Sequence, residues 1–311
     1  MALLENDVSW HVLRRILHKW AGNSAELEEV RPLQGGAINI TLALGLKDGQ
    51  RTVVKISPHR INRAYAEEAH QLDLLREIGL PTPKVYTTKL GSLEEPFSYI
   101  LLEYLEGVDL GQAKHNCSAD EFDGLQAQLA EMVLKIHERK NDSYTRCVEH
   151  AEKSFDTWPK FFREIYDPIW HDVEKSNVLP VKIRKQISRV HERLETLLAN
   201  NDGPRLTHWD LWSTNILVKA DIDGQWSISG ILDPNCKYAH TEAEIAYMEL
   251  FHTVTPAFLK AYQATRKLSP EYHRVRKTIY QLYPMINHVG LFGAEYLKPL
   301  AAIVEKTEAL A

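Results

Sequence analysis

The chain has 311 residues, 44% of them hydrophobic and 25% charged, and it carries a formal net charge of -5. This length exceeds what one simple core needs and suits two lobes around a cleft. The composition is that of an ordered globular protein, which excludes extensive disorder. Because basic residues are not in excess, nothing in the sequence indicates a nucleic-acid partner.

The sequence shows no signal for a membrane or for an oxidising compartment. The first 20 residues are amphipathic but interrupted by charges, so they lack the apolar run of a signal peptide. No segment approaches the roughly 20 apolar residues that cross a bilayer. The cysteines are odd in number and scattered, which fits neither a disulfide framework nor a zinc site: Cys117, Cys147 and Cys236. We therefore expect a cytoplasmic protein without a membrane partner.

The first part of the chain predicts a small lobe rich in β-structure. Helical spacing, alternation and turn residues predict these elements in order: a helix over about 9–20, strands over 40–46 and 52–56, a helix over about 64–78 and a strand over 99–102. Gly79 and Pro81 end the second helix. We expect residues 1–104 to form a nucleotide-binding lobe.

The remainder predicts a larger, mostly helical lobe over 105–311 that carries catalysis and substrate binding. Helices are expected up to about His137, over 181–198, and from Glu242 onward. Between Leu206 and Asp233 the pattern changes to a loop and two short strands joined by a turn. Loops held by rigid elements commonly carry function. The predicted class is α+β with two lobes.

The strongest chemical signal is residues 208–215 (HWDLWSTN), followed after the predicted hairpin by Asp233. Phosphoryl transfer needs a carboxylate that orients the attacking hydroxyl, and oxygen ligands that hold magnesium on ATP. Asp210 suits the first task, whereas Asn215 and Asp233 suit the second; His208 would brace the loop. The alternative is a His/Asp pair capping a turn, with the asparagine in left-handed geometry.

Lys55 and Glu68 predict an ion pair in the first lobe. Lys55 interrupts an otherwise apolar strand, and Glu68 shares one helical face with Leu72 and Leu75. A strand lysine paired with a helix glutamate is the arrangement that positions ATP phosphates in kinases. Glu67 lies about 100° round the helix and is less suited. The alternative is a solvated edge-strand lysine.

Gly35 and Gly36 precede the first hairpin and could let backbone amides approach phosphates. Taken alone they indicate only a turn, since no Walker A lysine or dinucleotide fingerprint follows. His240 could face substrate or be a hydrogen-bonded core histidine. Glu242 and Glu244 could cap and start a helix, or contact a substrate amine. The residues alone leave these alternatives open.

Several segments resemble the fructosamine (ketosamine) kinase family within the aminoglycoside phosphotransferase and protein-kinase-like superfamily. The resemblance covers about residues 10–300 and is carried by these segments: 208–215, 232–234, 238–242, 248–251 and 280–293. It implies a bilobal protein-kinase-like fold, ATP and Mg²⁺ as cofactors, and a sugar–amine adduct phosphorylated on a hydroxyl. It also implies site residues: Asp210 as base, Asn215 and Asp233 as magnesium ligands, Lys55 with Glu68 as phosphate-positioning pair, and the backbone of Glu103 to Leu105 at the adenine.

Four departures from the family pattern bear on specificity. Asn235 stands where a small residue is usual, and Ala37 stands where a cysteine is common. Trp209 and Thr214 stand where that family typically has glycine. Trp209 could reshape the acceptor pocket, and a β-branched Thr214 disfavours any positive φ needed there. The alternatives are an aminoglycoside-type or other metabolite phosphotransferase, a nucleotide-binding pseudokinase, and a non-catalytic helical interaction protein. We expect a monomer or homodimer that binds a small-molecule acceptor.

Overall fold

The computed structural model describes residues 8–33, 40–58, 63–92, 95, 97–148 and 153–307. The chain forms two compact units. The first contains Met1–Asp109 and Thr214–Pro234, and the second contains Leu110–Ser213 and Asn235–Ala311. No helix within the described ranges has the length and apolar character that a membrane crossing requires.

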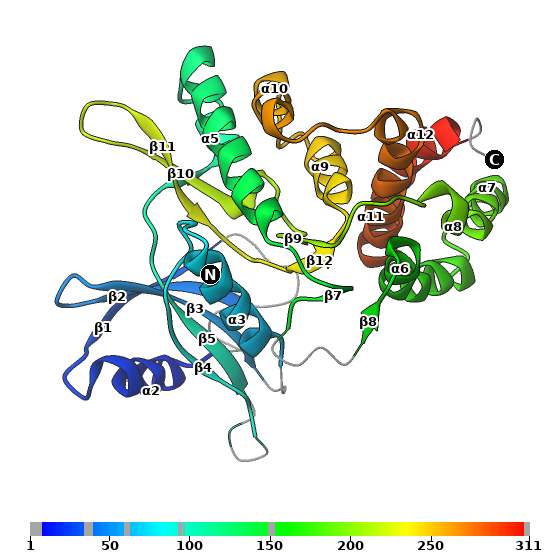
Figure 1. Cartoon of the computed structure of the whole chain (residues 1–311). Coiled ribbons are helices and arrows are strands. Elements are labelled where there is room, and N and C mark those ends of the chain that lie inside the picture. Colours follow the sequence, from blue (N-terminus) through cyan, green and yellow to red (C-terminus); the bar gives the residue numbers. More distant parts are fainter. Residues whose placement is uncertain are drawn as a thin grey trace. The chain divides into compact units, whose positions relative to one another are not determined.

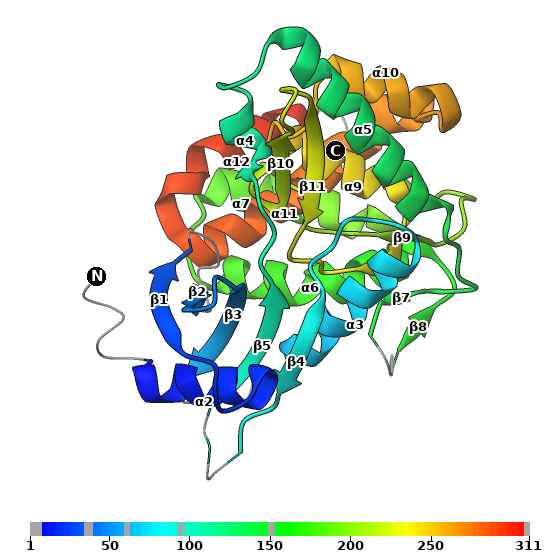
Figure 2. The ribbon, with the colours of Figure 1, turned by 90° about the vertical axis from the view of Figure 1, so that its left-hand side faces the viewer.

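A five-stranded antiparallel sheet forms most of the first unit (Figures 1 and 2). Its order is β1-β2-β3-β5-β4, so β3 lies in the middle. The strands are β1 (Leu27–Pro32), β2 (Ile40–Leu46), β3 (Arg51–Pro58), β4 (Val85–Lys89) and β5 (Phe97–Glu103). In the centre, Lys55 of β3 pairs with Thr41 of β2 and with Ile100 of β5.

Two helices cover opposite faces of this sheet. Helix α2 (Trp10–Ala21) begins at Ser9, whose Oγ accepts a hydrogen bond from the Val12 N–H. Its apolar residues pack in one cluster with Tyr99 and Leu101, whereas α3 (Ala64–Glu77) packs with Ile100 and Leu102. Because successive residues of a strand point to opposite faces, the alternation along β5 separates the two clusters.

A second sheet in the first unit contains the predicted hairpin. It has the order β11-β10-β6, formed by β6 (Val108–Asp109), β10 (Ile216–Ala220) and β11 (Trp226–Ile231). Gly107 precedes β6 with φ of 148°, and a Cβ there would lie 2.7 Å from the Val218 carbonyl oxygen. Only glycine permits both this backbone conformation and this close approach. Strand β6 therefore pairs closely with β10 of the hairpin, and it lies at the end of the unit's first segment, Met1–Asp109.

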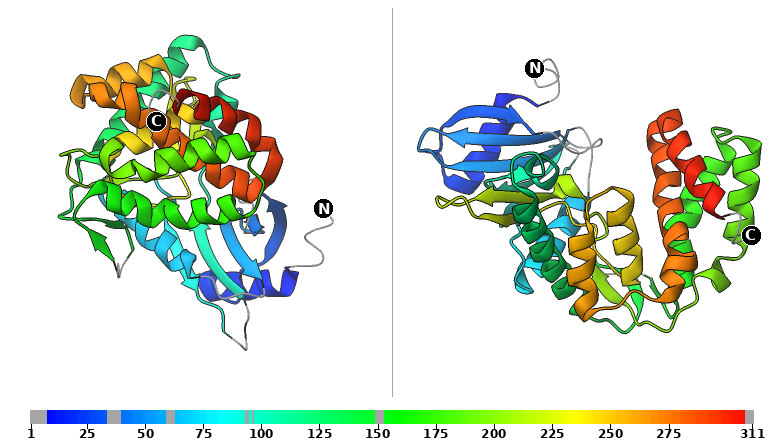
Figure 3. Two further views of the ribbon diagram at one scale, coloured as in Figure 1. Left: turned by 90° about the vertical axis from the view of Figure 1, so that its right-hand side faces the viewer. Right: turned by 90° about the horizontal axis from the view of Figure 1, so that it is seen from above.

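The second unit combines helices with a small sheet. Helix α6 packs against α11, and α12 packs against α11 and α7 (Figure 3). The helices are α4 (Leu110–Ala113), α5 (Ala119–Glu138), α6 (Trp158–Lys175), α7 (Val181–Glu192), α8 (Leu194–Leu197), α9 (Thr241–Leu250), α10 (Pro256–Thr265), η2 (Tyr272–Arg276), α11 (Lys277–Phe292), η3 (Gly293–Tyr296) and α12 (Leu297–Thr307). The sheet has the order β8-β7-β12-β9, formed by β8 (Ser154–Phe155), β7 (Tyr144–Arg146), β12 (Lys237–Ala239) and β9 (Arg205–Thr207).

The predicted α+β class and the long elements are confirmed. The helix predicted over 181–198 is wrong in its length, because α7 ends at Glu192 and α8 begins at Leu194. At the break the Arg193 N–H bonds to the Val190 carbonyl, three residues back, which tightens the last turn. Strands β1 and β4 were not predicted individually, since charged and polar residues interrupt their apolar pattern. The division at residues 104 and 105 stays a prediction.

Candidate active site

Lys55 is held between two carboxylates in the first unit. Its Nζ donates a hydrogen bond to Glu68 Oε1 at 2.6 Å and another to Asp233 Oδ1. The side chains of Lys55 and Glu68 are 12% and 13% exposed, and that of Asp233 is 40% exposed. Glu67 is exposed to solvent, as its helical position predicts. The alternative of a solvated edge-strand lysine is therefore wrong.

The two carboxylates determine the charge state of Lys55. Burial by itself lowers the pKa of an ammonium group, but Glu68 and Asp233 more than offset this and raise the pKa above its ordinary value of 10.5. Lys55 therefore stays protonated at physiological pH. It presents a fixed positive charge beside Asp233, which suits the binding of an anionic group such as a phosphate.

The β10–β11 hairpin places Asn215 and Asp233 at its open end. Ile216 pairs with Ile231, and the Leu232 N–H donates to the Asn215 carbonyl at 2.9 Å. Asn215 ends the short helix η1 (Ser213–Asn215) and is 7% exposed. Asp233 follows the hairpin with φ of 54°, a left-handed conformation. Four predicted site residues thus belong to one unit: Lys55, Glu68, Asn215 and Asp233.

The donor set at the hairpin end fits magnesium. Asn215 and Asp233 offer an amide and a carboxylate oxygen, which are ligands that a hard cation prefers. Within the residues that the structure describes, no group of three or more His, Cys, Asp and Glu could hold a metal. A pair of protein ligands is typical of Mg²⁺ sites that a nucleotide's phosphates complete.

The predicted adenine-binding residues follow the central strands. Glu103 ends β5, and its N–H donates to the Lys84 carbonyl at 2.8 Å. The side chain of Leu105 packs closely against Gly230 of β11. A Cβ added at Gly230 would lie only 2.8 Å from Leu105 Cδ1. Gly35 and Gly36 lie outside the described residues. The contact of these four residues with a nucleotide stays a prediction.

In the second unit, Asp210 follows β9 on a loop with tightly bonded neighbours. The Tyr247 hydroxyl donates to Asp210 Oδ1 at 2.6 Å. The Asp210 N–H reaches His208 Nδ1 at 3.4 Å, and the His208 carbonyl accepts from the Asn235 N–H at 3.0 Å. His208 is fully buried. The expectation that His208 braces the loop by hydrogen bonds is confirmed.

The residue before Asp210 has an unusual backbone. Trp209 has φ of 70°, a left-handed conformation that costs a side-chain-bearing residue about 1–2 kcal/mol. Its N–H donates to Glu244 Oε1 at 2.6 Å, and its ring lies 6.1 Å from that of Trp158. Thr214, where we expected positive φ to be a difficulty, has no positive φ. The left-handed conformation therefore falls at Trp209 and not at Thr214. A glycine at position 209 would adopt this conformation without the steric cost.

Lys237 is a buried cation that the sequence did not reveal. It is 2% exposed on β12, and its Nζ donates to Asn235 O at 2.8 Å and Asn235 Oδ1 at 2.9 Å. Its Nζ also lies 5.0 Å from the centre of the Trp209 ring. Burial, assisted by the charge of Arg146, lowers the pKa of Lys237 to about 7.

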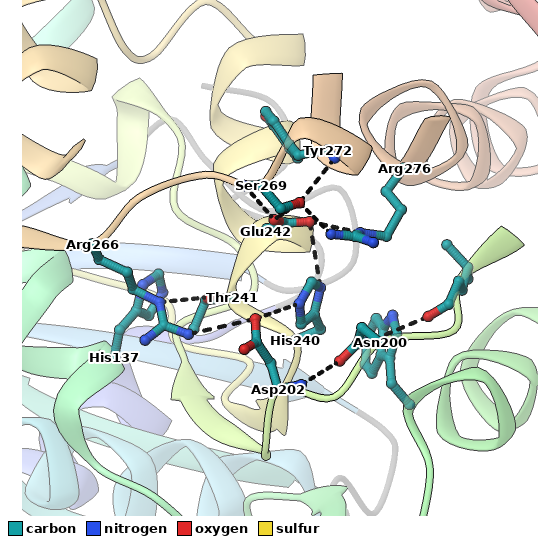
Figure 4. A network of polar contacts seen from close by, with 12 residues as sticks. His137, Asn200, Asp202, His240, Thr241, Glu242, Arg266, Ser269, Tyr272 and Arg276 are labelled. Atoms are coloured by element: carbon teal, nitrogen blue, oxygen red, sulfur yellow. Dashed lines mark hydrogen bonds and ion pairs between the residues drawn. The ribbon is translucent and has the colours of Figure 1, made fainter. Parts of the chain in front are cut away.

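His240 and Glu242 belong to a structural network in the second unit (Figure 4). The His240 ring contacts the Tyr280 hydroxyl at 2.9 Å and Asp202 Oδ2 at 3.1 Å. Glu242 accepts from Arg276 Nε at 2.7 Å and from the Ser269 hydroxyl at 2.7 Å. Both His240 and Glu242 are buried. His240 is thus a hydrogen-bonded core histidine, and Glu242 lies in the first turn of α9, as the helix-start alternative predicted.

Tyr247 and Lys237 are neighbours of the loop around Asp210 that sequence reasoning did not single out. Glu244 was expected to start a helix or contact a substrate amine, not to bond this loop. Glu244 and Tyr247 are three residues apart in α9, a spacing that places them on one helical face. This spacing was the available signal, but it does not identify what the face contacts. Lys237 had a weaker signal, a charged residue beside Cys236 in a short strand.

Comparison with known proteins agrees with this architecture. The family model described as fructosamine kinase matches residues 9–309. A protein of Vibrio parahaemolyticus named as a probable ketoamine kinase is 30% identical over 289 residues, which cover 90% of this chain and 92% of the relative.

Two solved structures share the fold. A Thermobifida fusca protein provisionally assigned as a fructosamine-3-kinase has a TM-score of 0.73 at 22% identity, covering 97% of this chain and 100% of that one. A thermostable mutant of aminoglycoside phosphotransferase APH(4)-Ia, solved with AMP-PNP and hygromycin B, has a TM-score of 0.67 at 16% identity, covering 94% and 98%. The predicted protein-kinase-like fold is confirmed. The chain belongs to the fructosamine kinase family.

Proposed function

We propose that this chain transfers the γ-phosphoryl group of ATP to a hydroxyl of a sugar–amine adduct, with Asp210 as the catalytic base. Membership of the fructosamine kinase family makes it an ATP-dependent phosphotransferase with an alcohol group as acceptor. The observation that carries the assignment of the site is the position of Lys55 between Glu68 and Asp233. A helical interaction protein would have no use for this buried arrangement. The presence of Lys55, Asp210, Asn215 and Asp233 together argues against a pseudokinase.

Each residue has a distinct task in the proposed reaction. Lys55 binds the α- and β-phosphates, and Glu68 keeps its ammonium in place. Asn215 and Asp233 hold Mg²⁺, which neutralises charge on the phosphates when it is bound. Gly35 and Gly36 supply backbone amides to the phosphates, and the backbone of Glu103 to Leu105 contacts the adenine.

Asp210 orients the acceptor hydroxyl and takes its proton. The hydroxyl oxygen forms a bond to the γ-phosphorus while the bond from that phosphorus to the bridging oxygen breaks. ADP leaves with the electron pair of the broken bond, and the acceptor leaves as a phosphate ester. Asp210 and Asn215 are only five residues apart in the sequence, which supports their action in one site.

The wider setting of the reaction is also part of the proposal. The three cysteines all lie in the described part of the chain and form no disulfide there, which supports a reducing cytoplasm as the setting. The acceptor is a small molecule, and the enzyme acts as a monomer or homodimer without nucleic acid or membrane as partner.

An ATP-consumption screen over ketoamines, aminoglycosides, choline and simple sugars tests this proposal, with Asp210→Ala as the blank. We expect the wild-type chain to turn over ketoamines. In Asp210→Ala, kcat should fall by at least about a hundredfold, while the affinity for ATP stays nearly unchanged. Full activity of Asp210→Ala would remove the assigned base. Turnover of aminoglycosides in place of ketoamines would favour the other acceptor class.

A further inference from the structure

Helix α9 contacts two consecutive residues of the catalytic loop. Glu244 Oε1 accepts from the Trp209 N–H at 2.6 Å, and the Tyr247 hydroxyl donates to Asp210 Oδ1 at the same distance. Side chains three residues apart lie on the same face of a helix. One helical face therefore holds the main chain before the base and the carboxylate of the base itself.

Glu244 ties this helix face to the core of the second unit. Its side chain has no exposed surface, and its Oε2 lies 2.8 Å from His137 Nε2 on α5. His137 Nδ1 in turn lies 2.8 Å from the Tyr262 hydroxyl on α10. Because three helices share this buried chain of hydrogen bonds, α9 offers a fixed reference for the loop.

Tyr247 is a donor to Asp210 under all physiological conditions. Burial, together with the negative charge of Asp210, raises the pKa of the Tyr247 hydroxyl well above its ordinary value of 10.0. The ring is supported by Phe251, with 4.7 Å between ring centres. A protonated hydroxyl on a supported ring limits the rotation of the carboxylate that it bonds.

We infer that Tyr247 is a positioning residue for the reaction, which fixes the orientation of the Asp210 carboxylate towards the acceptor hydroxyl. A general base works only within hydrogen-bond reach of the proton that it removes, so a loosely held carboxylate loses rate rather than binding. Tyr247 acts through Asp210 and touches neither ATP nor acceptor in this scheme. This inference rests on the proposed function, because it requires Asp210 to be the base.

The test compares Tyr247→Phe with Tyr283→Phe in steady-state kinetics with a ketoamine acceptor. Tyr283 is the control, since it is also a helical tyrosine whose hydroxyl bonds a side chain, His191 Nδ1 at 2.7 Å. Tyr283 is buried, whereas Tyr247 is half-buried. We expect Tyr247→Phe to lower kcat about tenfold, with both KM values changed less than about twofold. Tyr283→Phe should keep kcat and lower only the melting temperature.

A second arm repeats Tyr247→Phe in the Asp210→Glu background. The longer side chain displaces the carboxylate, so the loss from Tyr247→Phe should shrink to less than about twofold if the hydroxyl acts through Asp210. An unchanged kcat in the single variant would overturn the inference, and so would the same tenfold loss in both backgrounds. A higher kcat would show that the phenol obstructs the base, which also overturns it.

Different results would contradict Asp210 as the base and Tyr247 as its positioning residue. Full activity of Asp210→Ala contradicts the proposed function itself. Loss of activity in Asp210→Ala, combined with wild-type kcat in Tyr247→Phe, contradicts only the positioning role of Tyr247.

Discussion

The Lys55 ammonium on β3 bonds the Asp233 carboxylate, although the two residues are 178 positions apart in the chain. The contact forms because the hairpin that precedes Asp233 belongs to the same compact unit as the sheet that carries Lys55. It joins the proposed phosphate-binding cation to a proposed magnesium ligand. Opposite charges here reduce the repulsion that a lone carboxylate would exert on a triphosphate.

Replacing Asp233 should remove the magnesium dependence of nucleotide binding. In Asp233→Ala one of the two proposed protein ligands is lost, so the gain in ATP affinity on adding Mg²⁺ should fall by more than about tenfold. Calorimetric titration of ATP with and without Mg²⁺ measures this gain. Asp221→Ala, at the exposed turn of the same hairpin, is the control and should titrate as wild type. An unaltered magnesium effect in Asp233→Ala would refute the ligand role.

Trp209 should influence acceptor choice more than ATP binding. Trp209→Gly removes the ring of the residue next to Asp210, the proposed base. It should change the ratios of kcat/KM among acceptors, while the KM for ATP changes less than about twofold. Identical acceptor profiles would show that the ring does not shape the pocket.

The backbone of Trp209 makes a separate prediction for stability. Trp209→Ala also lacks the ring but keeps a Cβ in the left-handed conformation, φ of 70°. Trp209→Gly should therefore be about 1 kcal/mol more stable than Trp209→Ala in urea unfolding. Equal stabilities would mean that the loop relaxes once the indole is gone.

Lys237 should make stability rise with pH above neutrality. Its pKa is lowered to about 7 in the folded chain from an ordinary 10.5, so between these values the unfolded chain binds a proton that the folded chain has lost. The free energy of unfolding then increases with pH by up to ~1.4 kcal/mol per unit across this window. Below pH 7 both states are protonated and the buried charge destabilises the fold most.

The variant Lys237→Met should lack this contribution. The stability of Lys237→Met relative to wild type should be highest near pH 6 and decrease towards pH 10, as measured by urea unfolding at several pH values. Lys219→Met replaces an exposed lysine on β10 and serves as the control, with a difference that stays constant. A constant difference for Lys237→Met as well would contradict a neutral Lys237 at alkaline pH.

The sequence determined the features that depend on local periodicity. The helical face of Glu68, the apolar strand around Lys55 and the hairpin before Asp233 are all encoded within a few residues of each position. For that reason their elements could be predicted, and the lysine–glutamate pair followed from the chemistry of those elements. The family itself was also recognisable from short segments.

Only the tertiary structure decided which side chains surround Asp210. Tyr247 and Glu244 reach the loop from α9, and Lys237 reaches Trp209 from β12, through contacts for which no local pattern exists. The left-handed conformation likewise fell at Trp209 rather than at Thr214, because hydrogen bonding to Glu244 fixes the loop there. Periodicity describes one element at a time, whereas the burial and orientation of these groups depend on how several elements pack.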